Sequence, residues 1–294
     1  MQRIFIALVL SLPLAGAYGI FAIGIVLMYR ASRVLNLAHG AMAMVPAYVT
    51  YALFQAGVPL PFSLLLGLAF GAALGVGVEL VFVRRLRGDS LTAQTVGTVA
   101  ALGILVAAAA RLWGTFSRSG PSFFPEGHLS VGLSTVRYGE IGLFVVMVVV
   151  AGTLYAVIQR TDLGLMMRGT AEDPRAASLM GVDPDRITTL TWALGGALAA
   201  LGGVLLAAVT SLHPYTLALQ VLPAFIAALI GGLGSLPGAV VGAGIVAGVQ
   251  ALVPVFGSLD RTEGAPQLFL ALLAVAVMAR RGARYATASS QGSL

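Results

Sequence analysis

The chain has 294 residues, is 59% hydrophobic and only 10% charged, and has a mean hydropathy of +0.96. Because a soluble domain carries roughly 25% charged residues, this composition excludes an ordinary soluble protein and indicates a polytopic membrane protein. There is no cysteine, which excludes disulfides and cysteine metal sites, and no lysine, which excludes the phosphate-binding loop of a conventional P-loop ATPase.

Apolar stretches long enough to cross a hydrocarbon core of about 30 Å recur along the whole chain. They fall at about 5–29, 35–56, 60–82, 92–112, 140–159, 187–209 and 236–256, with a shorter one at 266–279. The stretch 218–234 is interrupted by Pro223 and by Gly231-Gly232, so it either crosses or forms a re-entrant half-helix. We therefore expect an all-α bundle of eight or nine spans, forming a single transmembrane domain over residues 1–294.

The third of these stretches carries a stripe of small residues. Gly67, Gly71 and Gly75 recur every four residues, so they share one face of a helix. Glycine on such a face lets a neighbouring backbone approach closely, which is how helices associate in lipid. The stripe predicts close helix packing and says nothing about a substrate.

The 17 basic residues are all arginine, and their positions indicate which loops are cytoplasmic. With residues 160–186 inside and the spans alternating, twelve of the 17 arginines lie on the cytoplasmic side, as the positive-inside rule requires. The same distribution favours topology-setting charge over nucleic acid binding, so we expect no nucleic acid partner. The N-terminus and an aromatic-rich loop at 113–139 are then external. Two interpretations of this loop stay open, namely anchoring at the membrane interface and docking of an external protein.

The cytoplasmic loop at about 160–187 is charged and contains clear helix start and stop residues. Asp173-Pro174 has the order of an N-cap followed by the first helical residue. Residues 175–180 then predict one or two helical turns, and Gly181 stands where a left-handed residue ends a helix. Asp183-Pro184 repeats the cap-and-proline order at the start of the span 187–209. The pattern predicts a short, fixed helix followed by a new helix start.

This short helix is expected to expose Leu179 and Met180 beside charged residues. A short amphipathic helix on the cytoplasmic face suits insertion into a groove of a partner protein. The alternative is an interfacial helix lying on lipid, but the segment is short and mixed in charge for strong membrane binding.

The segment from Thr161 to Ile187 resembles the cytoplasmic coupling loop of ABC-importer permeases of the branched-chain amino acid type, the LivH/LivM family. The matching residues are Gly164, Arg168, Gly169, Asp173, Ala176, Ala177 and Gly181. LNLAHGAMAM at 35–44 and ALIGGLGSLPGAVVGA at 228–243 are similar to two further signatures of that family. The three matches occur in the right order, and the resemblance extends over about residues 10 to 280. The modest length is more similar to LivH than to LivM.

The resemblance implies a permease subunit in a bacterial inner membrane that imports branched-chain or related small amino acids, with amides or urea as alternative cargoes. It implies a second, LivM-like permease subunit, two cytoplasmic ABC ATPase subunits and an external solute-binding protein. The chain itself would be non-catalytic and bind no cofactor or metal, since ATP and Mg would be used by the ATPases. The implied ATPase-coupling residues are Gly164, Arg168, Glu172, Asp173, Pro174, Arg175, Ala176, Ala177, Leu179, Met180 and Gly181.

A translocation path is suggested by polar residues and interruptions within the spans. Asn36 and His39 share a helical face if their segment is helical, and such residues either hold a bend through hydrogen bonds or line the path. The broken segment with Pro223, Gly231, Gly232 and Ser235 is the candidate counterpart interruption in the other half.

Two other classes of protein fit the sequence less well. An ion-coupled secondary transporter would carry ionisable groups deep in the bundle, and the one candidate, Glu79, is expected to reach the cytoplasmic interface beside Arg84 and Arg85. An intramembrane enzyme would need a nucleophile with a base, and Ser235 lacks the glycine spacing of a nucleophile turn.

Overall fold

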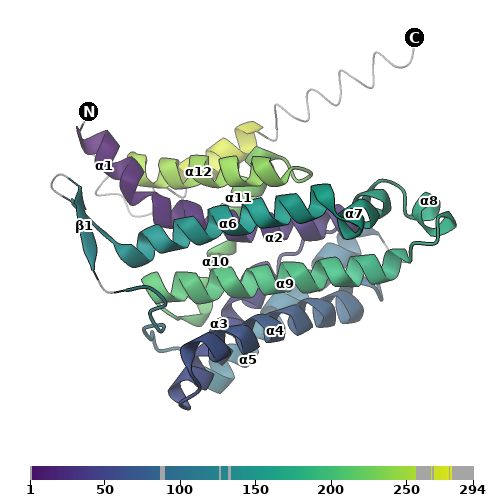
Figure 1. Cartoon of the computed structure of the whole chain (residues 1–294), viewed down its shortest axis with the longest axis horizontal. Coiled ribbons are helices and arrows are strands. Elements are labelled where there is room, and N and C mark those ends of the chain that lie inside the picture. The colour runs from purple at the N-terminus through teal and green to yellow at the C-terminus, as the bar shows by residue number, and fades with distance from the viewer. Residues whose placement is uncertain are drawn as a thin grey trace, which may run out of the picture.

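The computed structural model of the chain describes residues 2–86, 90–125, 127–131, 134–255, 266, 268–277 and 279. Most of the helices run side by side, with β1 near one end of the molecule and α8 at the other (Figure 1). The elements are α1 (Gln2–Leu10), α2 (Leu12–Ser32), α3 (His39–Gln55), α4 (Leu60–Val78), the π-helical turn η1 (Glu79–Val83), α5 (Leu91–Trp113), β1 (His128–Val131), β2 (Ser134–Arg137), α6 (Tyr138–Arg160), α7 (Asp162–Glu172), α8 (Pro174–Leu179), α9 (Pro184–Val209), α10 (Pro214–Leu219), α11 (Val221–Gly231), α12 (Leu236–Leu252) and η2 (Val253–Val255).

The described part of the chain is a polytopic helical membrane protein. Six of its helical segments are long and apolar enough to cross a membrane: Ile4–Ser32, Leu60–Val83, Leu91–Trp113, Tyr138–Arg160, Pro184–Val209 and Pro214–Gly231. Shorter apolar helices follow at Leu236–Leu252 and Leu268–Val277. Residues 218–231 of the ambiguous stretch belong to the sixth segment. The helix is interrupted at Gln220, between α10 and α11, and not at Pro223, which lies within α11; α11 ends at Gly231, as Gly231-Gly232 predicted.

The loop at 113–139, which we expect to be external, contains the two strands that the structure describes. β1 and β2 form an antiparallel hairpin in which His128 pairs with Arg137 and Val131 with Ser134. This hairpin is an exception to the expected all-α fold. Val136 of β2 is buried, whereas its cross-strand partner Leu129 of β1, on the same face, is exposed, so β2 is the strand that packs on the bundle.

The expected second span is wrong at its start, because α3 begins at His39 and not at residue 35. The chain leaves α2 through Arg33, which has a left-handed φ of 58°. It then turns back into the bundle, so that a Cβ at Gly24 would lie 2.7 Å from His39 Cε1. Gly24 is eight residues before the end of α2, or about 12 Å along the helix. α3 therefore begins inside the bundle, beside the middle of α2.

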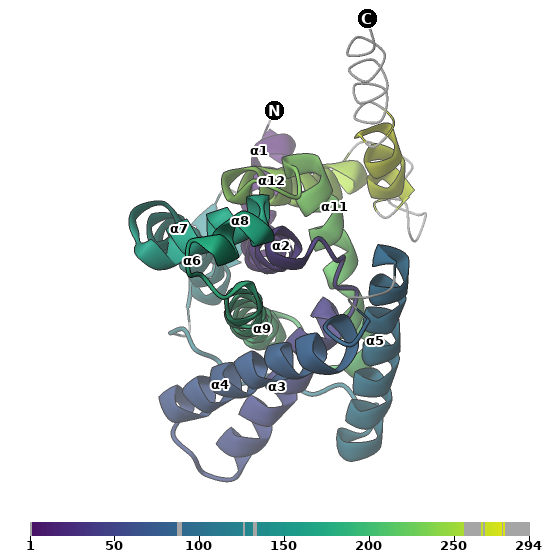
Figure 2. The ribbon, with the colours of Figure 1, turned by 90° about the vertical axis from the view of Figure 1, so that its right-hand side faces the viewer.

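α9 lies at the centre of the small-residue packing that the sequence predicted. Figure 2 shows α9 beside α4, with α2 on its other side. A Cβ at Gly75 of α4 would lie 2.2 Å from the carbonyl oxygen of Trp192, and one at Gly196 would lie 2.2 Å from that of Gly71. The backbones of α4 and α9 are therefore in direct contact, as glycine on a helix face permits.

Replacing Gly75 by valine is expected to force α4 and α9 apart. The new side chain would overlap backbone atoms of α9, which cannot move aside as a side chain can. Overpacking of this kind destabilises by about 1–3 kcal/mol or more. Thermal unfolding of the detergent-solubilised protein measures the loss. Gly77→Val is the matched control on the same helix, since a Cβ at Gly77 has no atom within 4 Å, and equal destabilisation by both variants would contradict the packing described.

Candidate functional site

The predicted capped helix in the loop at 160–187 is confirmed. Asp173 Oδ1 accepts hydrogen bonds from the backbone N–H groups of Arg175 at 2.8 Å and Ala176 at 3.1 Å, which begins α8. Gly181 then adopts a φ of +84°. Asp183 Oδ1 accepts from the N–H groups that start α9, at 3.0 and 3.3 Å. Side-chain caps at both helix starts give the loop a defined shape.

α8 presents its side chains to the surroundings at one end of the molecule (Figure 1). Leu179 is 88% exposed and Met180 is 84% exposed, whereas Ala177 is buried. The other residues implied in coupling on α8 and its N-terminal side are exposed: Glu172, Asp173, Pro174, Arg175 and Ala176. Two large apolar side chains at the tip of a rigid helix are typical of anchors for a protein partner.

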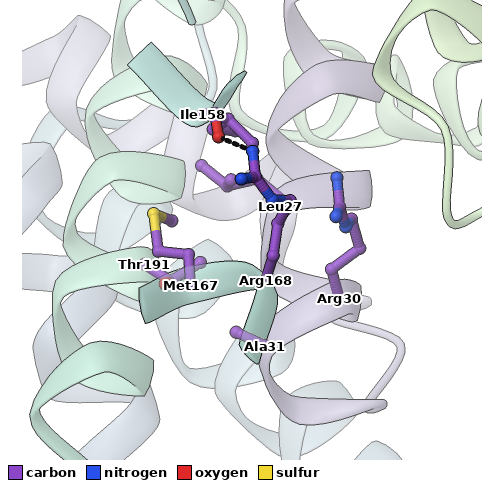
Figure 3. Close-up of a pocket in the computed structure, with 7 residues that line it drawn as sticks. All are labelled: Leu27, Arg30, Ala31, Ile158, Met167, Arg168 and Thr191. Carbon is purple, nitrogen blue, oxygen red and sulfur yellow. Dashed lines mark hydrogen bonds between the residues drawn. The ribbon is translucent and has the colours of Figure 1, made fainter. Parts of the chain in front are cut away.

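A second helix in the loop, α7, was not predicted. Thr161 caps it by accepting a hydrogen bond from Gly164 N at 3.2 Å, so the signal was the Thr161-Asp162 pair after the span. A Cβ at Gly164 would lie 2.2 Å from the carbonyl oxygen of Ile158. One helical turn later, the Arg168 guanidinium donates to that same carbonyl and, at 3.1 Å, to Gln159 Oε1 (Figure 3).

This geometry explains the Gly-x-x-x-Arg spacing. Residues four apart lie on one face of a helix, so Gly164 and Arg168 both meet the last turn of α6. The glycine permits the backbone contact, and the arginine satisfies a carbonyl that the end of α6 leaves without a helical partner. The motif fastens α7 to α6.

α7 is also fastened to α2. Arg33 Nη2 donates a hydrogen bond to the carbonyl of Ala171 at 3.1 Å. Arg30 of α2 and Arg168 of α7 line a common pocket at this junction (Figure 3). Its volume of about 10 Å³ holds no more than about one water molecule, so the pocket is a joint between helices and not a solute site.

Gly164→Val is expected to detach α7 from α6, because its side chain would overlap the Ile158 backbone. In the importer that the sequence resemblance implies, this change should uncouple transport. Uptake driven by ATP should fall by about tenfold or more if the loop transmits the drive. The matched control is Gly169→Val on the same helix, where a Cβ has no atom within 4 Å. Limited proteolysis of the loop and an uptake assay check both variants. Normal uptake by Gly164→Val would contradict a role for the contact between α7 and α6 in coupling.

The start of α9 is fastened to η1, which continues α4, by hydrogen bonds to the ion pair Glu79–Arg84 at η1. Glu79 is fully buried, and its Oε1 lies 3.0 Å from Arg84 Nε. Thr189 on α9 donates to Glu79 Oε2 at 3.2 Å, and Arg84 donates to the carbonyl of Asp185 at 3.3 Å. The expectation that Glu79 reaches the interface is wrong, since η1 turns its side chain inward toward α9.

The predicted path residues Asn36 and His39 do not share a helical face, because Asn36 lies in the turn before α3. Asn36 Oδ1 accepts from the N–H of Ala38 at 3.1 Å, and its amide contacts the sulfur atoms of Met28 and Met42 at 3.2 Å. His39 is fully buried, with its ring edge-on to Phe21. For Asn36, this geometry favours the interpretation that it holds a bend.

Three other predicted path residues meet where α11 turns into α12. Ser235 caps α12 by accepting from Gly238 N at 3.0 Å. A Cβ at Gly231 would lie 2.0 Å from the carbonyl oxygen of Gly238, and Gly232 has a φ of +91°. These residues form the tight connection between the two helices.

The remaining path residue, Pro223, lines a large cavity of about 1070 Å³ on the side of the bundle. The cavity lies among α2, the turn before α3, α10 to α12 and the helix Leu268–Val277, which Figure 2 shows beside α11. Leu35 and Leu37 line it, on either side of the inward-facing Asn36. Its polar residues include Tyr18, Gln220 and Gln250, which were not predicted although both glutamines interrupt apolar runs.

Comparison with known proteins identifies the family. The model of the family described as "Branched-chain amino acid transport system / permease component" matches residues 7–279. The high-affinity branched-chain amino acid transport system permease protein LivH of Salmonella typhimurium is 30% identical over 256 residues, covering 81% of this chain and 82% of LivH. BraD of Pseudomonas aeruginosa, of the same description, is also 30% identical, with 82% and 83% covered.

More distant matches extend beyond that group. The galactofuranose transporter permease protein YtfT of Escherichia coli is 29% identical over 245 residues, covering 80% of this chain and 69% of YtfT. Among solved structures, PsaBC from Streptococcus pneumoniae aligns with 91% of the chain at a TM-score of 0.46 and 15% identity. The match over residues 7–279 decides the assignment: the chain belongs to the permease-component family of branched-chain amino acid transport systems and is a multi-pass membrane protein.

Proposed function

We propose that this chain is the LivH-like permease subunit of an ABC importer that carries leucine, isoleucine or valine into the cytoplasm of a bacterial cell. The observation that supports coupling to an ATPase is α8, which presents Leu179 and Met180 from a fully capped helix at the end opposite the hairpin. The cargo is supported by the names of the relatives LivH and BraD.

The partners follow from this role. Two cytoplasmic ATPase subunits use ATP and Mg. One docks on α8 of this chain, and the other docks on the second permease subunit. A second, LivM-like permease completes the membrane part, and a solute-binding protein docks outside, on the side of the hairpin. This chain is a single non-catalytic domain without a cofactor. We include α3, α12 and Leu268–Val277 with the six longer helical segments as membrane-crossing or partly crossing helices, within the eight or nine spans expected.

The helix joints suggest how the drive passes from α8 to the bundle. Movement of the loop would be transmitted to α6 and α2 through α7. It would be transmitted to α4 through the hydrogen bonds of Asp185 and Thr189, at the start of α9, to the Glu79–Arg84 pair at η1. Closure of the ATPases would thereby bias a rigid-body shift between inward-open and outward-open states.

The test is uptake of radiolabelled L-leucine by proteoliposomes containing the complex purified through a tag on this chain. Uptake is expected to require ATP hydrolysis and to resist a protonophore, with competition by isoleucine and valine. Uptake that survives inactive ATPase subunits but collapses with the proton gradient would identify a secondary transporter instead. Stronger competition by urea, amides or galactofuranose would overturn the cargo.

A further inference from the structure

We propose that Gln220 and Gln250 bind the carboxylate of the transported amino acid inside the large cavity, where Tyr18 holds them in place. The inference rests on the proposed function, because it assigns a contact for the solute within the membrane. Tyr18, Gln220 and Gln250 lie outside the three segments that resemble the family.

The three side chains meet across widely separated parts of the chain. Tyr18 Oη lies 2.8 Å from Gln250 Oε1 and 3.3 Å from Gln220 Oε1. Tyr18 comes from the middle of the segment Ile4–Ser32, Gln220 from the junction of α10 and α11, and Gln250 from α12. Polar side chains within a span face the protein interior or a water-filled cavity, not lipid, and all three line the cavity.

The amide N–H groups of Gln220 and Gln250 are available to donate hydrogen bonds to a ligand. A hydroxyl donates one hydrogen, and the shorter distance assigns that of Tyr18 to Gln250. No hydrogen bond from either amide nitrogen occurs within the described part of the chain. If the Gln220 amide is reversed so that it donates to Tyr18 Oη, three of the four amide N–H bonds are still available. Three or four N–H donors in one cavity suit a carboxylate, which only accepts hydrogen bonds.

The walls of the cavity suit the rest of the solute. They are formed largely by apolar side chains, including Leu35, Leu37, Leu222, Phe225 and Ile226. No charged residue is among the described residues that line the cavity. Neutral donors hold a carboxylate less tightly than an arginine does, and a transport site must release what it binds. The ligand class is therefore a small amino acid with an aliphatic side chain.

Protection from labelling tests the site without relying on transport. The natural chain has no cysteine, so Leu222→Cys places a single thiol in the cavity wall. In the purified complex, millimolar L-leucine is expected to slow maleimide labelling several-fold. L-leucinamide, which lacks the carboxylate, is expected to have little effect. The added pair Gln220→Leu and Gln250→Leu should remove protection, whereas Gln55→Leu, outside the cavity, should keep it.

Tyr18→Phe distinguishes two roles of the glutamines, namely binding the ligand and holding the helices together through hydrogen bonds with Tyr18. This variant breaks the internal hydrogen bonds but keeps both amides, so it should lower protection and uptake by no more than about threefold. The double glutamine variant should lower leucine uptake by about tenfold or more, the effect of losing about 1.4 kcal/mol.

The outcomes for the site and for the proposed function are distinct. Equal protection by leucine and leucinamide, unchanged protection in the double glutamine variant, or a Tyr18→Phe defect as large as the double defect would overturn the site. Absence of ATP-dependent leucine uptake by the wild-type complex would overturn the proposed function, while the labelling result would still decide whether the cavity binds the carboxylate.

Discussion

Replacing Leu179 and Met180 together by aspartate is expected to release the ATPase subunits from this chain and to lower ATP-driven uptake by about tenfold or more. Both side chains are more than four-fifths exposed at the tip of α8, so they contribute little to folding, and exposed substitutions usually change stability by within about 0.5 kcal/mol. At an interface, loss of an apolar anchor weakens binding by about 2 kcal/mol or more. Co-purification of ATPase subunits and membrane insertion are measured on the same preparation.

Leu129→Asp is the matched control for this variant. Leu129 is also an exposed leucine, but it lies on the hairpin at the other end of the molecule (Figure 1). We expect it to retain the ATPases in full. Retention of the ATPases by the double α8 variant would contradict the docking role of the helix, and loss in both variants would mean that the defect is general instability.

Arg84→Met is expected to destabilise the protein by about 3–5 kcal/mol, because it removes an arginine that pairs with a fully buried carboxylate. Glu79→Gln should have a smaller effect, since the Arg84 side chain is 32% exposed and keeps its contact with the Asp185 carbonyl. The combined variant Glu79→Gln and Arg84→Met should regain most of the stability. Thermal unfolding of the four proteins gives the coupling free energy.

The same double variant separates folding from coupling. It restores a neutral core but lacks the hydrogen bonds by which Arg84 ties the end of η1 to Asp185 and Thr189 at the start of α9. ATP-driven uptake should therefore remain below that of the wild type although the protein is stable. If Arg84→Met alone unfolds at the wild-type temperature, the ion pair has no role in stability, and if the double variant transports normally, the pair has no role in coupling.

The parts of the fold that follow from neighbouring residues were predictable. Asp173-Pro174 and Asp183-Pro184 supply cap and first helical residue within the same few positions, and Gly181 ends the helix through its own backbone conformation. Each interaction spans at most a few residues, so the pattern alone specifies it. α7 was missed although its Thr161 cap is equally local, because it directly follows the end of a span.

The parts that depend on distant residues were not predictable from a single sequence. The turn before α3 is held by Asn36 on two methionine sulfurs and by Leu37 N–H donating to Thr98 Oγ1 at 3.0 Å. Glu79 is turned inward by a partner on α9, 110 residues away. Tyr18 and Gln250 are 232 residues apart and meet in the cavity. Such contacts arise only once the helices have packed.

The most direct test of energy coupling at α8 is site-specific cross-linking from Met180→Cys in this otherwise cysteine-free chain. In intact cells with the partner subunits, we expect the thiol to be shielded from a membrane-impermeant maleimide and to cross-link to an ATPase subunit. Leu129→Cys in the hairpin is expected to be labelled from outside and to give no such product. External labelling of Met180→Cys, or a folded complex that yields no ATPase cross-link at this position, would contradict the assignment of α8 as the cytoplasmic docking helix.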